Sequence, residues 1–188
     1  MTLQDTDNHA AAGKYLTFFL QGGNYGIPIT KVREIIAVQP ITALPRMPSA
    51  VRGVINLRGK IIPVVDLRSG LGLHAAAHDR ATCIIVLDVE VTDQNASHIG
   101  CIVDAVSEVA DVESEELQEP PSIGSHTAGS RSRSESILAL AKREEDDHVV
   151  TLLDMPTILR GLLGTDQLVP GSADLDTTSQ GAREAAQA

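Results

Sequence analysis

Aromatic side chains are almost absent from this chain of 188 residues. It contains no tryptophan, and its two phenylalanines and two tyrosines all lie between Tyr15 and Tyr25. Proteins that hold single-stranded nucleic acid stack its bases on aromatic rings along the binding groove. The rest of the chain therefore offers no such platform, and the core must be built from isoleucine, valine and leucine.

Basic residues are also few, with 15 Lys+Arg against 25 Asp+Glu, a formal net charge of −10 and a pI near 4.9. Binding to nucleic acid phosphates or to an anionic membrane surface depends on lysine and arginine. The charge balance argues against both as principal partners. Hydrophobic residues make up 43% of the chain, which is enough for a folded core.

Long apolar runs and cysteine motifs are missing too. No uninterrupted apolar stretch approaches the roughly 18 residues of a membrane-spanning helix. The first residues, MTLQDTDNHAAAG, have neither the basic start nor the apolar stretch of a signal peptide. Cys83 and Cys101 form no CxxC pair and lie in apolar stretches, where a thiol behaves as a small buried hydrophobe. These features predict a reduced, cytoplasmic protein without direct membrane insertion.

Composition divides the chain into one folded region between two polar ends. We expect flexible tails at residues 1–14 and 166–188, because neither offers enough apolar surface to offset the entropy of ordering it. The folded region should span 15–165. Within it, 111–135 combines an acidic run with a Pro/Gly/Ser-rich stretch and is predicted to be a long exposed loop.

The folded region is rich in β-strand patterns and poor in helix patterns. Short β-branched runs with Gly and Pro between them, and no βαβ rhythm, predict an all-β barrel architecture. ATCIIVLDVEV and HIGCIV, joined by DQNAS, are expected to form a hairpin. Other strands are expected at 15–20, 51–57, 59–67, 136–140 and 148–154.

Only short helices are expected. ITKVREII, residues 29–36, is predicted to make a turn or two. Asp66 can cap a short turn that ends before Gly72, and Asp154, with Pro156 just after it, can open a terminal helix.

Catalytic motifs are not found. The chain has no phosphate loop, no dinucleotide fingerprint and no GxSxG elbow. His74 and His78 have the i,i+4 spacing of a metal-binding pair, but no third ligand is placed by the sequence, so an Ala-rich loop is the favoured interpretation. Asp66 and Asp104 each end a β-rich run, where a cap or turn role is favoured over acid–base catalysis.

A charged residue, Arg58, interrupts the apolar stretch VRGVINLRGKIIPVVDLR. A desolvated, unpaired guanidinium costs several kcal/mol, so a buried Arg58 needs a partner, for which Glu34 in KVREII is the candidate. The alternative is that Arg58 sits with Gly59 in a solvent-facing hairpin turn. The sequence favours neither.

These same segments carry a family resemblance. In order they are YLTFFLQGGNYGIPITKVREII, ITALPRMPSAVRGVINLRGKIIPVVDLRSGLGL, TCIIVLDV, HIGCIVDAVSEVADV and VVTLLDMPTILRGLL. Over about residues 15–163 the chain resembles the CheW-like family of chemotaxis coupling proteins, and the block GVINLRGKIIPVVDLR is highly specific for it. The resemblance implies an all-β fold of two interlocked five-stranded SH3-like barrels, with a hydrophobic seam between them and a few short helices.

The resemblance also implies a function. It points to a non-enzymatic adaptor, without catalytic residues, cofactor or metal, that couples the regulatory domain of a CheA-type histidine kinase to the cytoplasmic tips of methyl-accepting chemoreceptors. Such proteins work in arrays at the inner face of the membrane. The positions matching the family's partner-binding residues are Val32, Glu34, Gly53, Arg58 and Thr82.

Three of these positions also have structural interpretations. Val32 can be ordinary core, Gly53 can serve the backbone of its turn, and Thr82 can be a plain strand former.

Departures from the family pattern leave other functions open. The loop at 120–135 is longer and more polar than usual, and AKREEDD replaces a short turn. The alternatives are a coupler of a non-flagellar pathway such as twitching motility, a competitor that occupies the coupler's place, and a small metal-dependent enzyme using His74 and His78.

Overall fold

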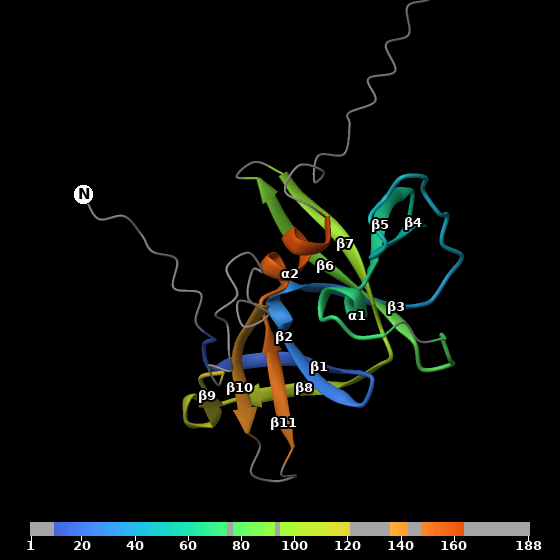
Figure 1. The fold of residues 1–188 in the computed structure, drawn as a ribbon. Helices are drawn as coiled ribbons and strands as arrows, with labels where there is room; N and C mark the ends of the chain where they lie inside the picture. The colour runs from blue at the N-terminus through green and yellow to red at the C-terminus, as the bar shows by residue number, and fades with distance from the viewer. Residues whose placement is uncertain (1–9, 75–76, 93–94, 121–135, 143–147, 164–188) are drawn as a thin grey trace, which may run out of the picture.

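The structure, a computed structural model, describes residues 10–74, 77–92, 95–120, 136–142 and 148–163. Within these ranges the chain forms two β-sheets with a few short helices (Figure 1). The predicted all-β class is confirmed. Where the resemblance implied two five-stranded barrels, the structure has one sheet of six strands and one of five, because the two-residue strand β9 (Leu117–Gln118) joins the first.

The chain passes from one sheet to the other and back. It starts in the six-stranded sheet, builds all five strands of the second, and then returns to complete the first, so the two sheets interlock (Figure 1). The six-stranded sheet has the order β8-β1-β2-β11-β10-β9. Its strands are β1 (Gly13–Leu20), β2 (Gly23–Pro28), β8 (Ala105–Val112), β9 (Leu117–Gln118), β10 (Ile137–Lys142) and β11 (Val149–Leu153).

The five-stranded sheet has the order β3-β6-β7-β5-β4. Side chains from all five strands meet in one apolar cluster, so this sheet is curled around its own core. The predicted hairpin of 81–103 is confirmed as β6 and β7, which pair antiparallel. The strands are β3 (Val32–Ala37), β4 (Val51–Leu57), β5 (Lys60–Asp66), β6 (Cys83–Thr92) and β7 (Asn95–Val103).

Two of the predicted helix starts are confirmed. The Asp66 side chain accepts a hydrogen bond from the Arg68 backbone N–H at the start of α1 (Leu67–Gly70). Asp154 accepts one from the Thr157 N–H, 3.2 Å away, at the start of α2 (Met155–Leu163). Two single turns, η1 (Ile29–Lys31) and η2 (Ser114–Glu116), are 3-10 helical.

In the part of the chain that the structure describes, apolar side chains form three clusters. One lies inside each sheet, and the largest lies between the sheets, where it also takes in one face of α2. This seam was implied by the family resemblance. Its buried members are Leu16, Phe18, Leu20, Ile27, Val51, Val65, Leu67, Ile85, Leu87, Val89, Ile99, Cys101, Val103, Leu153, Met155, Ile158, Leu159 and Leu163.

Alternation along the strands explains how two clusters share one hairpin. On β6, Ile84 and Val86 point into the five-stranded sheet, whereas Ile85 and Leu87 point into the seam. Because both faces of β6 are covered, the strand is a continuous apolar run rather than an alternating one. Cys101 on β7 is fully buried in the seam, and burial raises the pKa of its thiol and of the half-buried Cys83 thiol.

The predicted helix at 29–36 is wrong beyond its first turn. Only Ile29–Lys31 is helical, and the chain then enters β3, which pairs with β6 from Val32 to Ala37. The apolar spacing that suggested a helix face belongs to a strand with a bulge between Val32 and Glu34. β-Branched residues favour that extended conformation, and the long neighbouring strand supplies the hydrogen bonds.

The first part of the exposed loop expected at 111–135 contains regular structure instead. Residues 111 and 112 end β8, and Glu113 begins a capping box in which its own N–H donates to Glu116 Oε2 at 2.8 Å. Leu117 then pairs with Ala141 of β10 and packs on the core of the six-stranded sheet. Residues 121–135 and the tails at 1–9 and 164–188 lie outside the described residues.

Candidate partner-binding site

Arg58 lies at the tip of the hairpin between β4 and β5. Arg58 and Gly59 are its two loop residues, with φ of 54° and 86°, the positive pair that a type I′ turn requires. The Arg58 Nη2 atom lies 2.9 Å from Glu34 Oε2 on β3. Of the interpretations left open by the sequence, the solvent-facing turn is confirmed and a buried Arg58 is wrong, although the predicted partner, Glu34, does contact the exposed guanidinium.

Exposure sets the energetic weight of this pair. The Arg58 side chain is 80% exposed and that of Glu34 is 21% exposed. An ion pair of this kind contributes roughly 0–1 kcal/mol to folding, since water and salt screen it. It links the hairpin end of β4 and β5 to edge strand β3, while leaving the guanidinium accessible to another molecule.

A second charged group lies along the same strands. Arg33 Nη1 is 3.6 Å from Asp88 Oδ1, and His98 Nδ1 approaches that oxygen to 2.8 Å. The histidine contact lacks the angle of a hydrogen bond, so it counts as an ion pair only when His98 is protonated. Asp88 and His98 are direct cross-strand partners, and Glu34 pairs with the nearby Val86. Charged groups thus follow β3, β6 and β7 at this part of the sheet.

Apolar side chains on β3 flank Glu34. Val32 is half-buried and packs against the seam. Ile35 is 44% exposed, although its cross-strand partner Ile85 is fully buried in the seam. We call Val32 and Ile35 the β3 ledge. It extends the inter-sheet core to the surface on one face of β3, whereas Glu34, opposite Val86, lies on the other face of that strand.

Gly53 has a backbone role. Its φ is +138°, and a Cβ atom there would lie 2.1 Å from the carbonyl oxygen of Thr42. Next to it, the N–H groups of Thr42 and Val54 each donate to the other residue's carbonyl at 2.9 Å. A side chain at Gly53 would push this crossing segment off β4. The structural interpretation of Gly53 is the one its geometry supports.

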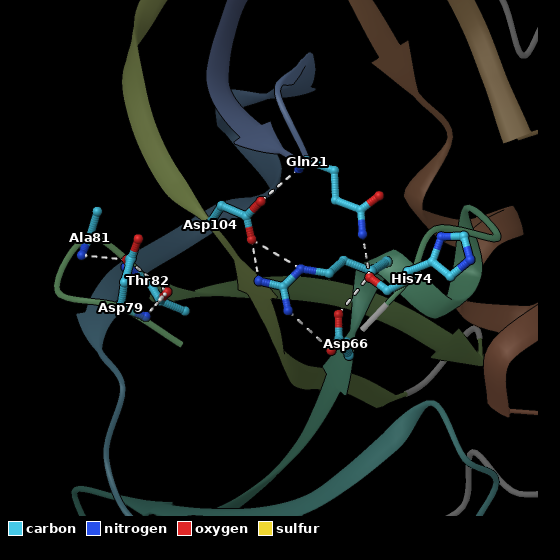
Figure 2. A network of polar contacts seen from close by, with 8 residues as sticks. Gln21, Asp66, His74, Asp79, Ala81, Thr82 and Asp104 are labelled. Atoms are coloured by element: carbon cyan, nitrogen blue, oxygen red, sulfur yellow. Dashed lines mark hydrogen bonds and ion pairs between the residues drawn. The ribbon is translucent and has the colours of Figure 1, made fainter. Parts of the chain in front are cut away.

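Thr82 closes a short loop before β6. Its hydroxyl accepts from the Asp79 N–H at 2.9 Å, and Asp79 Oδ1 accepts from the N–H groups of Ala81 and Thr82 (Figure 2). These bonds favour the charged carboxylate and lower the pKa of Asp79. Thr82 is buried and orders this loop. No contact in the described part of the chain joins it or Gly53 to the Arg58–Glu34 pair.

The sequence did not single out Arg68, which has the largest fully buried side chain among the residues that the structure describes. Its Nε and Nη2 atoms donate to Asp104 Oδ1, the former at 3.0 Å, and Nη1 lies 3.6 Å from Asp66 Oδ2. The other oxygen of Asp104 accepts from the Gln21 N–H, and Figure 2 shows these two labelled residues facing each other. The only signal was an arginine two residues after an aspartate that ends an apolar strand.

His74 and His78 do not share a helix face. Both are exposed, and the described residues on either side of 75–76 are not helical. Among the residues that the structure describes, no three His, Cys, Asp or Glu side chains are grouped as metal ligands would be. Within those residues, too, no helix is long and apolar enough to cross a membrane.

A family model described as the CheW-like domain matches residues 14–162. The chain belongs to the CheW-like family. The matched region includes β3, the β4–β5 hairpin and the loop before β6, and so holds all five predicted partner-binding positions. CheW-like proteins are the scaffold and coupling proteins of chemotaxis.

Individual CheW proteins are similar to this chain over most of its length. The chemotaxis protein CheW of Rhizobium meliloti is 36% identical over 132 residues, which cover 70% of this chain and 81% of that protein. CheW of Klebsiella aerogenes is 34% identical over 108 residues, 57% of this chain and 62% of that protein. The latter match thus spans less than two thirds of the relative's own length.

A solved CheW structure shares the fold. It is the scaffolding protein TtCheW from Thermoanaerobacter tengcongensis, with a TM-score of 0.65 and 27% identity over 84% of this chain and 93% of that one. The arrangement of two sheets around a common seam is therefore that of an experimentally determined member of the family.

Proposed function

We propose that this chain is a non-enzymatic adaptor that couples methyl-accepting chemoreceptors to a CheA-type histidine kinase. The observation that carries the proposal is the Arg58–Glu34 ion pair, formed between the β4–β5 hairpin and β3, the strand that also carries the β3 ledge. It joins two of the positions that the family resemblance assigned to partner binding. Membership of the CheW-like family supports the proposal.

The site has the character of a surface for a partner helix. The cytoplasmic tip of a chemoreceptor presents helices, and a helix can place apolar side chains at i, i+3 and i+4 against Val32 and Ile35. Arg58, 80% exposed, is free to exchange part of its interaction with Glu34 for a partner carboxylate. Such charges set register and partner choice more than they set raw affinity.

Signal transfer by such an adaptor is positional. The chain holds the kinase regulatory domain and the receptor tip at fixed places, so a small receptor movement changes the population of active kinase. This requires two binding surfaces held in a fixed relation, and the inter-sheet core packs the two sheets against each other.

A role without catalysis agrees with how the carboxylates are used. Asp66 caps α1 and faces Arg68, while both oxygens of Asp104 accept hydrogen bonds from Arg68 and Gln21. The two aspartates weighed as catalytic groups are thus engaged in internal contacts. We place the adaptor in the cytoplasm, in receptor arrays at the inner face of the membrane.

The proposal is tested by measuring kinase autophosphorylation in a mixture of receptor, kinase and the full chain. We expect the wild-type chain to raise kinase activity in a receptor-dependent manner. Arg58→Glu, which faces Glu34 with a like charge, should lower that activation by about ten-fold, the size of a typical coupling energy. Glu34→Arg combined with Arg58→Glu re-forms the pair with reversed polarity. Restored activation would show that the ion pair itself is needed, whereas activation that stays low would show that the sign of each charge is needed.

The control is the ion pair between Lys14 and Asp111, with Nζ and Oδ2 2.7 Å apart on the other sheet. Lys14→Glu should leave activation unchanged. Kinase activity that does not respond to the wild-type chain would refute the adaptor role. Kinase activity that falls when the chain is added would favour the competitor, and equimolar zinc in the purified chain would revive the enzyme using His74 and His78.

A further inference from the structure

The guanidinium of Arg68 is held between the two sheets. Arg68 lies in α1, directly after β5 of the five-stranded sheet, and its side chain is 1% exposed. It contacts two carboxylates, those of Asp104 and Asp66. Withdrawing these charges from water is costly, so a buried group of this kind adds little net stability compared with apolar side chains of the same size. Its contribution is geometric, because its hydrogen bonds fix how the groups that they join are oriented.

Asp104 occupies the point where the chain changes sheets. It is the single residue between β7, the last strand of the five-stranded sheet, and β8, the next strand of the six-stranded one. Its N–H donates to the carbonyl of Phe19 at 3.0 Å, and its Oδ2 accepts from the N–H of Gln21 at 2.6 Å. One carboxylate thus connects Arg68 of one sheet to the β1–β2 hairpin of the other (Figure 2).

Gln21 reinforces this connection. Its φ is 48°, a left-handed conformation that non-glycine residues seldom adopt. The bond from its N–H to Asp104 holds that turn, and its Nε2 donates to the carbonyl of His74, in the segment after α1. The hairpin of the six-stranded sheet is therefore bonded at two places to parts of the chain that belong to the five-stranded sheet.

Apolar packing alone does not fix the angle between the sheets. The seam is large, but hydrophobic contact is non-directional and tolerates small sliding and rotation. Short hydrogen bonds to charged groups permit one geometry. The cluster of Arg68, Asp104, Asp66 and Gln21, which we call the joint, is the polar group that spans both sheets at the crossover.

We propose that the joint fixes the relative orientation of the two sheets, so that a partner bound on one sheet is held in register with a partner bound on the other. This inference rests on the proposed adaptor function for its consequence, but its structural part stands alone. Arg68 and Asp104 act as positioning residues: they touch neither partner, and they determine whether two binding events become one signal.

The decisive variant combines Arg68→Met with Asp104→Asn. It removes both charges, keeps an apolar stem in place of Arg68, and leaves an amide oxygen to accept from Gln21. Residual dipolar couplings of the backbone amides in the full chain report orientation directly. One alignment tensor should describe both sheets of the wild type, whereas the double variant should need two. Lys14→Met with Asp111→Asn is the matched control and should keep one.

Coupling is measured with the same variants. The double variant should bind the isolated kinase regulatory domain and the receptor fragment with dissociation constants within about two-fold of wild type. Its receptor-dependent kinase activation should fall by about ten-fold or more, as expected when coupling rather than binding is lost. Should the double variant not fold, Asp104→Asn alone serves, with a smaller effect of the same kind.

The outcomes separate the two proposals. A single tensor in the variant, with the wild-type orientation, overturns the joint whatever the binding results. Unchanged kinase activation alongside two tensors shows that sheet orientation does not matter for coupling, and overturns the functional part. If the wild type binds neither partner, the adaptor function fails, while the dipolar couplings still decide the joint.

Discussion

The two arginines of the motif GVINLRGKIIPVVDLR are paired with carboxylates in opposite environments. Arg58 is 80% exposed and faces Glu34 at the surface, whereas Arg68 is 1% exposed and faces Asp104 and Asp66 between the sheets. The chemistry is the same, and the surroundings decide what it does. The exposed pair contributes little to folding and remains available to a partner, while the buried group determines geometry and is costly to leave incomplete.

Arg68→Ala should give the largest effect. It leaves the 5%-exposed side chain of Asp66 and that of Asp104 without their counter-charge. We expect a loss of about 3–5 kcal/mol in the free energy of unfolding, measured by urea denaturation. Arg68→Lys, which keeps the charge, should lose less. A loss below about 1 kcal/mol in the alanine variant would erase the contrast between the two arginines.

Gly53→Ala should come next. Its Cβ would meet the Thr42 carbonyl at 2.1 Å in a positive-φ conformation, so we expect destabilisation of roughly 2–3 kcal/mol. Gly59→Ala is the matched control, because φ is also positive there but nothing lies within 4 Å of the added atom. Thermal unfolding of both variants separates the collision from the conformational cost. Equal decreases in melting temperature for the two variants would show that the segment at Thr42 moves aside at little cost.

Arg58→Ala should affect stability much less and binding much more. Loss of an exposed ion pair changes the free energy of unfolding by about 1 kcal/mol at most. Affinity for the kinase or the receptor should fall by about ten-fold, if a partner charge is desolvated on binding. Calorimetric titration together with a melting curve tests both parts. A large drop in melting temperature with intact binding would make Arg58 a structural residue.

The smallest effect is expected at Asp79. Its pKa is lower in the folded chain than its ordinary value, chiefly because the Ala81 N–H and then the Thr82 hydroxyl bond the carboxylate. The charge therefore stabilises the fold above the unfolded pKa, and that stability is lost as the pH falls through the folded pKa. Asp79→Asn should be slightly less stable than wild type at pH 7. The difference in the free energy of unfolding between wild type and variant should disappear below about pH 4, close to the ordinary carboxyl pKa. A difference that stays constant with pH would contradict this.

Much of the fold was predictable, because strands buried on one or both faces leave strong patterns. The β6–β7 hairpin follows from two β-branched runs around a turn. Strand β2 was missed, since Gly23 and Gly26 resemble turn residues. Gly26 is in fact needed because a Cβ there would lie 2.8 Å from the Leu152 side chain. That requirement comes from a strand distant in the sequence, and local patterns do not contain it.

The candidate site was predictable in part for a similar reason. Charge complementarity suggested Glu34 as the partner of Arg58, and the structure confirms the contact. An aspartate two residues earlier does not by itself distinguish Arg68 from a surface arginine, because the burial of Arg68 depends on the return of the chain at Asp104 and on the β1–β2 hairpin. Position within the tertiary structure, not residue type, separates the two arginines.

The most direct test of the central claim is calorimetric titration of the full chain with the regulatory domain of the CheA-type kinase from the same cell. Saturable one-to-one binding by a chain shown to be folded is the predicted result. No heat and no complex, with the same folded chain and the cognate domain, would contradict the adaptor function.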